Sequence, residues 1–476
     1  MDGVTPDEID LLAIDRGSVS APAGCGKTHL IARTLTRHSD PKPILVLTHT
    51  NAGVAALRGR LDRFQVPRAS YRLATLDGWA MRLIGTFPGR SGHDPSILAL
   101  GNPRSDYHAI RVAAVELLQA GHISDVLSAS YDRLIVDEYQ DCSEIQHFIV
   151  GLASNTLRTC VLGDPLQAIF NFAGRLADWE KDVREHFPPA GELSTPWRWI
   201  NAGEQGFGEW LLDARRSLLA GGGVDLSSAP ANVVWLPLDG ISDEAIKLEA
   251  CRTPALSKDG GVLIMAESKK PDRQRRFARN TPDAVAIESV DLGDLVSFAR
   301  AFRVTESDAL DRIIEFAESV MANLGGTETL ERVREHLAGT STAPPSDAEA
   351  AALRFAAAPT HRGALGFLSA LNAQTGVRVH RPTVFRSCLK ALEACPDDEQ
   401  ASFLAMAIKM REENRLLGRP LPGRAVGSTL LLKGLEAEVA VILDAHGMNP
   451  AHLYVAMTRG ARKLVVCSRT PKLPAW

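Results

Sequence analysis

The sequence has no long hydrophobic run and few cysteine residues. Among its 476 residues, no segment approaches the roughly 18 consecutive apolar residues of a membrane-spanning helix. The seven cysteines include no Cys-x-x-Cys pair, so their spacing predicts neither a zinc site nor a disulfide framework. Residues 1–8 are polar and acidic, unlike a secretory signal peptide. These absences predict a cytoplasmic protein without a membrane partner.

The chain also lacks a large excess of charge of either sign. Its 53 lysine and arginine residues and 57 aspartate and glutamate residues give a formal net charge of −4. A nucleic acid would therefore have to bind in a local groove rather than through the field of the whole protein. The one dense basic segment, residues 269–279, is interpreted as a solvated loop in preference to a DNA contact.

The length predicts more than one domain, because a single hydrophobic core rarely extends over so many residues. Up to about residue 195, short apolar β-rich runs alternate with helical patterns. This alternation predicts an α/β fold with a doubly wound parallel sheet. The predicted strands of this half are residues 18–20, 44–48, 73–75, 133–137 and 159–163.

A second α/β pattern begins near residue 190, is interrupted, and resumes near the C-terminus. Its predicted strands are residues 233–236, 261–265, 285–287, 428–432, 437–443 and 463–467. The interruption is rich in helical patterns, at residues 308–321, 328–337, 346–357 and 398–417. We therefore predict a first domain over 1–195 with a small helical insertion at about 85–130, a second domain split between 196–295 and 425–476, and an inserted helical subdomain over 296–424.

Residues 21–28, Ala-Pro-Ala-Gly-Cys-Gly-Lys-Thr, have the form of a phosphate-binding loop. Gly24 and Gly26 let backbone amides curve around an anion, Lys27 would reach the outer phosphates, and the Thr28 hydroxyl would ligate Mg²⁺. The alternative is a glycine-rich turn ahead of an ordinary helix, which rarely carries the full Gly-x-Gly-Lys-Thr ending after a strand. The predicted nucleotide contacts in this loop are Ala23, Gly24, Cys25, Gly26, Lys27 and Thr28.

Residues 134–141, Leu-Ile-Val-Asp-Glu-Tyr-Gln-Asp, form an apolar strand that ends in two carboxylates. Asp137 could hold the metal, and Glu138 could orient or deprotonate an attacking water. The alternative is a solvated strand end. Together with the phosphate-binding loop, the pair favours hydrolysis of a nucleoside triphosphate over nucleotide binding alone.

Further motifs follow in a defined order. They are Leu-Gly-Asp-Pro-Leu-Gln-Ala-Ile-Phe-Asn-Phe at 162–172, Thr-Pro-Trp-Arg at 195–198, Leu-Lys-Gly-Leu-Glu at 432–436 and Tyr-Val-Ala-Met-Thr-Arg-Gly-Ala-Arg at 454–462. In this order the motifs resemble those of the UvrD/Rep/PcrA branch of superfamily 1 helicases. The compact chain also resembles the helicase-like subunit of Gabija anti-phage systems. The resemblance implies two RecA-like P-loop domains with parallel sheets, small helical insertions in each, and ATP with Mg²⁺ bound between them.

The resemblance also implies roles for individual residues. Lys27 and Thr28 would bind the phosphates and Mg²⁺, Asp137 would support the metal, and Glu138 would be the catalytic base. The other implied nucleotide-site residues are Gln167 as a sensor of the γ-phosphate, Arg198 and Arg459 as arginine fingers reaching across from the second domain, Trp197 as the aromatic that stacks on adenine, and Glu436.

For the polynucleotide, the resemblance implies single-stranded or partly duplex DNA running across the tops of both domains. Aromatic side chains can stack on bases without regard to sequence. The candidate contacts are Thr48, His49, Thr50, Asn51, Thr75, Trp79, Phe170 and Phe172. The alternative for Trp79, Phe170 and Phe172 is that they are ordinary core residues.

The sequence departs from the family pattern at several positions. His49 replaces an aromatic residue, Ala173 replaces an arginine, and Leu430 and Leu431 replace a histidine and a small hydroxyl residue. No glutamine precedes the phosphate-binding loop over residues 7–16, where the family reads adenine. The first hypothesis is an ATP-dependent translocase or helicase moving 3′ to 5′ on single-stranded DNA. The alternative is a helicase-derived regulatory subunit that senses DNA or nucleotide and acts through a nuclease partner in an anti-phage complex.

Overall fold

The computed structural model describes residues 9–170, 174–267, 270–288, 291–395, 400–416 and 422–474. These residues form two compact units. Unit 1 comprises the described residues up to Trp235, together with Ala445–Leu464 and those from Thr470 onward. Unit 2 comprises the described residues of Leu236–Asp444, together with Val465–Arg469. The phosphate-binding loop and the Asp137-Glu138 pair both belong to unit 1.

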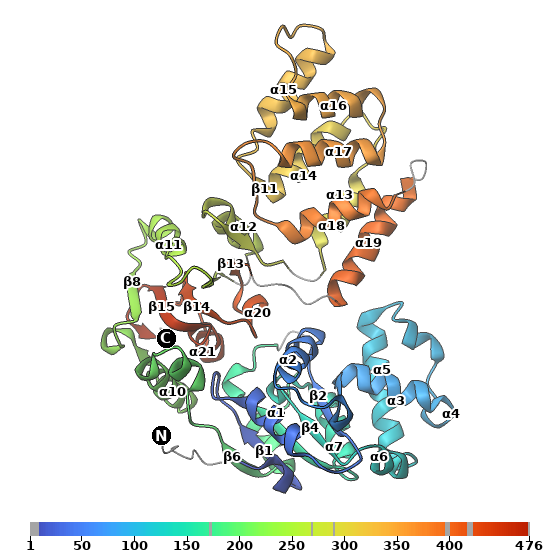
Figure 1. The fold of residues 1–476 in the computed structure, drawn as a ribbon, viewed down its shortest axis with the longest axis vertical. Coiled ribbons are helices and arrows are strands. Elements are labelled where there is room, and N and C mark those ends of the chain that lie inside the picture. The colour runs from blue at the N-terminus through green and yellow to red at the C-terminus, as the bar shows by residue number, and fades with distance from the viewer. Residues whose placement is uncertain are drawn as a thin grey trace. The chain divides into compact units, whose positions relative to one another are not determined.

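Unit 1 is built on a six-stranded sheet with the strand order β3-β2-β4-β5-β1-β6 (Figure 1). Every neighbouring pair of strands in this sheet is parallel. Its strands are β1 (Arg16–Ser20), β2 (Ile44–Thr48), β3 (Tyr71–Thr75), β4 (Arg133–Val136), β5 (Arg158–Gly163) and β6 (Pro189–Glu192). Each strand predicted in this half overlaps one of the first five, so the predicted α/β class is confirmed.

Helices cover both faces of this sheet. Because side chains alternate along a strand, Val46 of β2 joins one apolar cluster and its neighbours Leu45 and Leu47 join another. The first cluster includes α1 (Lys27–Arg37) and α2 (Asn51–Arg63); the second includes α3 (Leu76–Thr86), α5 (Pro103–Gln119) and α7 (Glu144–Ala153). Strand β2 is buried along its whole length, as expected for a parallel strand with both faces covered. The segment 85–130, predicted to be helical, contains α5, which packs against α3 and α7.

A second six-stranded sheet has the strand order β10-β13-β9-β14-β15-β8. Strand β9 pairs in parallel with β13 and β14, and β13 pairs in parallel with β10. The strands are β8 (Val233–Pro237), β9 (Val262–Met265), β10 (Ala284–Ala286), β13 (Arg424–Gly427), β14 (Ala437–Ile442) and β15 (Gly460–Ser468). The strand predicted at 428–432 is wrong. The Ser428 side chain accepts a hydrogen bond from the Leu431 amide and begins a short helix, α20 (Thr429–Leu432), directly after β13.

The helix-rich part of unit 2, whose helices are labelled α13 to α19 in Figure 1, has an apolar core of its own. Alanine, leucine and phenylalanine make up most of this core, and Phe298 stacks on Phe316 with ring centroids 4.4 Å apart. The helices are α13 (Gly293–Ala301), α14 (Ala309–Val320), α15 (Gly326–Leu337), α16 (Asp347–Ala357), α17 (His361–Asn372), α18 (Pro382–Glu393) and α19 (Gln400–Leu416). Among the helices of the described ranges, none combines the length and the apolar composition that a membrane crossing requires.

The basic segment near residue 270 is helical, which corrects its interpretation as a loop. Helix α12 spans Pro271–Asn280, and its residues Arg273, Arg275 and Arg276 form ion pairs with acidic side chains. Arg275 lies 2.7 Å from Asp294 and 3.1 Å from Asp272, and Arg276 pairs with Glu244. Lys269 lies outside the described residues.

Candidate functional site

The phosphate-binding loop joins β1 to α1 and has the backbone that its glycines allow. Gly24 and Gly26 adopt φ angles of 73° and 89°, in the left-handed region that side chains with a Cβ disfavour. A Cβ on Gly24 would also lie 2.5 Å from the Trp199 ring. Gly26 is the N-cap of the 11-residue helix α1, so the amides at that helix end face the place where an anion would bind.

Lys27 joins this loop to the carboxylates at the end of β4. Its Nζ lies 2.9 Å from Asp137 Oδ1 and 2.5 Å from Glu138 Oε1. Burial by itself would lower the pKa of Lys27, but the two carboxylates raise it above its ordinary value. Burial raises the pKa of Asp137, and Lys27 opposes that effect. The ammonium and the two carboxylates are therefore held together where the phosphates of a nucleotide would arrive.

The candidate ligands for a divalent cation are Thr28 and Asp137. A hydroxyl and a carboxylate oxygen are the hard ligands that Mg²⁺ takes beside nucleotide phosphates, so these residues fit the metal. Cations of the protein contact both ligands: Lys27 pairs with Asp137, and Arg60 Nη1 donates to Thr28 Oγ1 at 2.9 Å. Sequence reasoning missed Arg60. It lies on α2, among several arginines with nothing in their spacing to distinguish it.

Glu138 has an unusual backbone conformation. Its φ and ψ are 56° and 40°, in the left-handed region that a glutamate rarely occupies. Its side chain is 35% exposed, whereas that of Asp137 is 9% exposed. The backbone turn thus separates the two carboxylates, leaving the metal-ligand candidate buried and the candidate base open to water.

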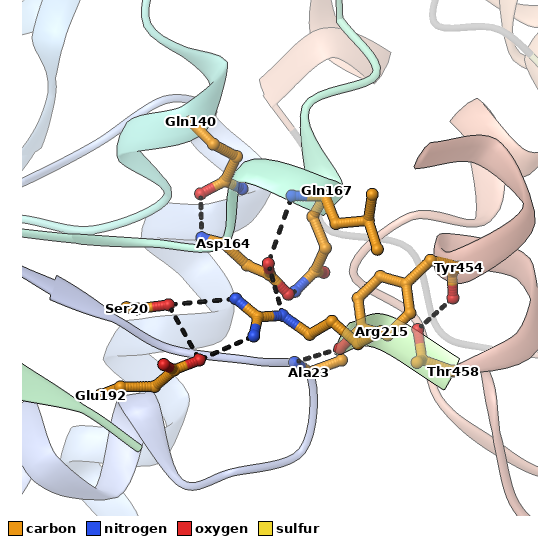
Figure 2. Close-up of polar contacts among 10 residues, drawn as sticks. Ser20, Ala23, Gln140, Asp164, Gln167, Glu192, Arg215, Tyr454 and Thr458 are labelled. Atoms are coloured by element: carbon orange, nitrogen blue, oxygen red, sulfur yellow. Dashed lines mark hydrogen bonds and ion pairs between the residues drawn. The ribbon is translucent and has the colours of Figure 1, made fainter. Parts of the chain in front are cut away.

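A hydrogen-bonded chain connects Glu138 to Gln167, the predicted γ-phosphate sensor, and Figure 2 shows its members Gln140, Asp164 and Gln167. Gln140 donates from Nε2 to Glu138 Oε2 at 2.6 Å, and its Oε1 accepts the Asp164 amide at 3.1 Å. Gln167 Nε2 donates to Asp164 Oδ2 at 3.1 Å. Asp164 is 1% exposed. One buried carboxylate therefore lies between the candidate base and the candidate sensor.

Arg215 completes this network and was missed by sequence reasoning (Figure 2). It lies on α10 (Gln205–Leu219) and donates to Asp164 Oδ1 at 3.0 Å, to Glu192 Oε1 at 2.7 Å and to Ser20 Oγ at 3.0 Å. Burial by itself would lower the pKa of Arg215, but Asp164 raises it. The signal was present: Arg215 falls within the buried stripe of an amphipathic helix, with Leu211 and Leu218.

The segments around Arg198 and Arg459 contact the phosphate-binding loop within unit 1. The Arg198 amide donates to Gly24 O at 3.0 Å, and its Nη1 donates to Thr458 O at 2.5 Å. Arg459 is 3% exposed and donates from Nε to Val455 O at 2.7 Å and from Nη2 to Thr458 Oγ1 at 2.9 Å. These bonds hold Arg459 at the end of α21 (Pro450–Met457). Both arginines therefore belong to unit 1, together with the phosphate-binding loop. The resemblance to the helicase family instead assigns them to a second domain.

Two other nucleotide-site predictions differ in their surroundings. Trp197 is 42% exposed, and a Cβ on Gly26 would lie 3.2 Å from its ring, so this indole stands open beside the loop. Glu436 belongs to unit 2, and its role in nucleotide binding stays a prediction.

The candidate DNA contacts divide into capped, buried and partly exposed side chains. Thr50 and Thr75 are N-caps whose hydroxyls accept the Gly53 and Gly78 amides at 3.0 Å, so both have a structural use. Thr48 is buried. Trp79 is 1% exposed and belongs to the core cluster with Leu76 and Leu83, which corrects the prediction that it stacks on bases. The remaining candidates are His49 and Phe170, with ring centroids 5.8 Å apart, the exposed Asn51, and Phe172, which lies outside the described residues.

Residues 98–184 match the family described as the UvrD/REP helicase N-terminal domain. The stretch includes the Asp137-Glu138 pair and the motif with Gln167. Among curated proteins, the chain is 38% identical over 74 residues to an ATP-dependent helicase/nuclease subunit of Lactococcus lactis subsp. lactis (strain IL1403). That match covers 15% of this chain and only 6% of the relative's length. The resemblance to UvrD-like superfamily 1 helicases is thus supported over the part of the chain that carries these motifs.

Two solved helicase structures align along nearly the whole chain at low similarity. The alignment with a Pif1 helicase from Candida albicans covers 98% of this chain and 95% of the helicase chain, with 12% sequence identity and a TM-score of 0.42. The alignment with an arterivirus nonstructural protein 10 (helicase) in complex with DNA covers 97% of this chain and 62% of the viral chain, with 10% sequence identity and a TM-score of 0.35.

Proposed function

We propose that the chain is a UvrD-like superfamily 1 motor that hydrolyses ATP with Mg²⁺ and moves along DNA. The observation that carries this proposal is the contact of Lys27, at the base of a phosphate-binding loop, with Asp137 and Glu138. A lysine, a buried carboxylate and a half-exposed carboxylate at one end of a parallel sheet are the groups that phosphoryl transfer to water requires. A nucleotide-binding module without turnover has no need of the second carboxylate.

The residues divide the chemistry among themselves. The loop amides and Lys27 would hold the β- and γ-phosphates, whose arrival draws the ammonium away from Asp137. Thr28 and Asp137 would hold Mg²⁺, which neutralises charge on the phosphates when it is bound. Glu138 would orient the attacking water and accept its proton, and its partial exposure leaves room for that water.

The remaining predicted residues complete the proposed site. Gln167 would respond to the γ-phosphate, and Arg198 and Arg459 would supply positive charge to the transferring phosphoryl group. Fixed cations of this kind raise the rate by about 10³–10⁵-fold. Trp197 would stack on adenine, and Glu436 would be a further nucleotide-binding residue. We also propose that the first domain ends near residue 195 and that a helical subdomain between about residues 295 and 425 interrupts the second.

The polynucleotide proposal rests on chemistry at the carboxyl ends of β2 and β5. His49, Asn51 and Phe170 are the candidates with side chains at least partly open to a strand of DNA. We infer a single-stranded or partly duplex DNA substrate and 3′-to-5′ movement in the cytoplasm from the resemblance to UvrD-like helicases.

The test is the steady-state ATPase activity of the full chain, with and without single-stranded DNA, beside Glu138→Gln. We expect DNA to stimulate hydrolysis. Glu138→Gln should bind ATP within about threefold of wild type and lose about 10²–10⁴-fold in turnover, the usual contribution of a general base. Normal turnover in this variant would show that Glu138 is not the base. Absence of ATP hydrolysis by the wild type under all conditions would reject the motor.

A second candidate function is a regulatory subunit that senses DNA or nucleotide and acts through a nuclease in anti-phage defence. Altered DNA-facing positions favour it: His49, Ala173, Leu430 and Leu431 all differ from the family pattern. The matched relative is named as part of a helicase/nuclease. For this function we expect weak stimulation by DNA alone and a large gain when a nuclease encoded beside the gene is added. Strong DNA stimulation of the isolated chain would instead favour the independent motor.

A further inference from the structure

We propose that Arg215 is a positioning residue for hydrolysis, which links helix α10 to the candidate base and the candidate γ-phosphate sensor through Asp164. This inference rests on the proposed function and adds a residue to the same site. Arg215 lies outside all of the motifs that led to the site.

The first argument is that the guanidinium is buried and that all of its nitrogens donate hydrogen bonds. Arg215 is 4% exposed, and its three nitrogens each donate a hydrogen bond, to Asp164, Glu192 and Ser20. Burying an arginine beside carboxylates stabilises a fold little compared with an apolar residue of similar volume. Arg215 lies on the same buried stripe of α10 as Leu211 and Leu218. If this position only had to pack against the core, a leucine would be sufficient.

The second argument is that Asp164 is shared between Arg215 and the catalytic candidates (Figure 2). Its Oδ1 accepts Arg215 Nε, and its Oδ2 accepts Gln167 Nε2. Its amide donates to Gln140, which donates in turn to Glu138. A change at Arg215 therefore reaches Gln167 through the Asp164 carboxylate, and it reaches Glu138 through the Asp164 backbone amide and the Gln140 side chain.

The third argument is a parallel contact at the phosphate-binding loop. The Ala23 amide donates to the Tyr454 hydroxyl at 3.2 Å, and α21, which carries Tyr454, packs against α10. Burial raises the pKa of this phenol well above its ordinary value, so it stays neutral. The packed pair α10 and α21 thus contacts the phosphate-binding loop through Tyr454 and, through Arg215, the Asp164 carboxylate that accepts a hydrogen bond from Gln167.

The contact between Arg215 and Asp164 predicts how the protein distinguishes ATP from ADP. Lys27 and Thr28 do not contact Arg215, so loss of the guanidinium should leave ADP binding unchanged. Asp164 would lose its ionic partner, Gln167 would lose its fixed acceptor, and recognition of the γ-phosphate should weaken. We expect a fall in kcat of about 10–100-fold, the usual cost of removing a residue that orients a catalytic group, and a rise in the KM for ATP that follows the weaker recognition of the γ-phosphate.

The experiment compares Arg215→Met with Arg216→Met in the full chain. Arg216 is the next residue of the same helix, and its side chain is 74% exposed, so it controls for the loss of one arginine from α10. The measurements are kcat and KM for ATP, the binding ratio of a non-hydrolysable ATP analogue to ADP, and the melting temperature. We expect Arg215→Met to lower kcat and to reduce the binding ratio about tenfold or more, while Arg216→Met behaves as wild type. A purely structural role would lower the melting temperature and leave both kcat per folded molecule and the binding ratio unchanged.

Two further variants keep the inference falsifiable if Arg215→Met does not fold. Arg215→Lys retains the charge but cannot reach all three partners, and we expect an intermediate binding ratio. Glu192→Gln weakens a different partner of Arg215, half-exposed at 53%, and should leave the ratio unchanged. A normal ratio in Arg215→Lys, or an equal loss in Glu192→Gln, would overturn the inference. If the wild type does not hydrolyse ATP, the proposed function fails and the binding ratio alone decides the role of Arg215.

Discussion

Replacing Lys27 by methionine tests the charge arrangement of the site without any nucleotide. The Lys27 Nζ lies 2.9 Å from Asp137 Oδ1 and 2.5 Å from Glu138 Oε1, so one ammonium compensates both carboxylates. Methionine keeps most of the volume and removes the cation. The two carboxylates, which belong to adjacent residues, are then left facing one another without a counter-ion.

The size of the effect follows from burial. The Asp137 side chain is 9% exposed, and that of Glu138 is 35% exposed, so solvent screens the second pair and most of the loss comes from the first. Removing one partner of a buried ion pair costs about 3–5 kcal/mol, because the other charge stays buried without compensation. We expect Lys27→Met to reduce the free energy of unfolding by about 3 kcal/mol.

The assay is denaturant unfolding of the nucleotide-free chain, in a double-mutant cycle with Asp137→Asn. Because neutralising Asp137 removes the uncompensated charge, Lys27→Met with Asp137→Asn should be more stable than Lys27→Met alone, with a coupling energy of about 1–3 kcal/mol. Lys181→Met, at an exposed lysine, is the control. Stability of Lys27→Met within about 0.5 kcal/mol of wild type, the range of neutral surface changes, would refute this reasoning. Additive effects of the two substitutions would refute it as well.

Three further predictions address the loop and the tryptophans. Gly24→Ala should abolish nucleotide binding in a titration with fluorescent ATP, since its Cβ would meet the Trp199 ring. Gly121→Ala, with a nearly identical φ of 71° and open space around it, should bind normally and lose about 1 kcal/mol of stability; equal binding by both variants would contradict the steric argument. Trp197→Ala should weaken ATP binding about tenfold, corresponding to a stacking energy of about 1–3 kcal/mol, without lowering the melting temperature; unchanged affinity would exclude the stacking role. Trp79→Ala should destabilise unit 1 by about 3–5 kcal/mol through the cavity it leaves, and an unaffected melting temperature with weaker DNA binding would restore Trp79 as a DNA contact.

The motifs of the site were readable in the sequence because their geometry is local. Gly24 and Gly26 set the backbone of the loop by their own φ angles, and Lys27 follows directly at the start of α1. Asp137 and Glu138 follow an apolar strand that is buried in any parallel sheet. Neighbours in the chain determine these features, so no knowledge of distant contacts was needed.

Burial could not be read in the same way, because it depends on which segments pack together. Trp79 and Trp197 are the same residue type near predicted site elements, yet one lies in the core and the other is 42% exposed. At residues 424–432, Ser428 ends a strand and caps a helix, and the apolar run alone did not reveal where the change occurs.

The sequence by itself determined the α/β class, most strands and the backbone form of the phosphate-binding loop, since period and turn chemistry act over a few residues. Only the tertiary structure decided that Arg215 reaches Asp164 and that Tyr454 reaches Ala23, across separations of 51 and 431 residues. Such contacts depend on how helices α10 and α21 pack, and side-chain hydrogen bonds form only within about 3 Å. A single chain carries no local signal for a partner that distant.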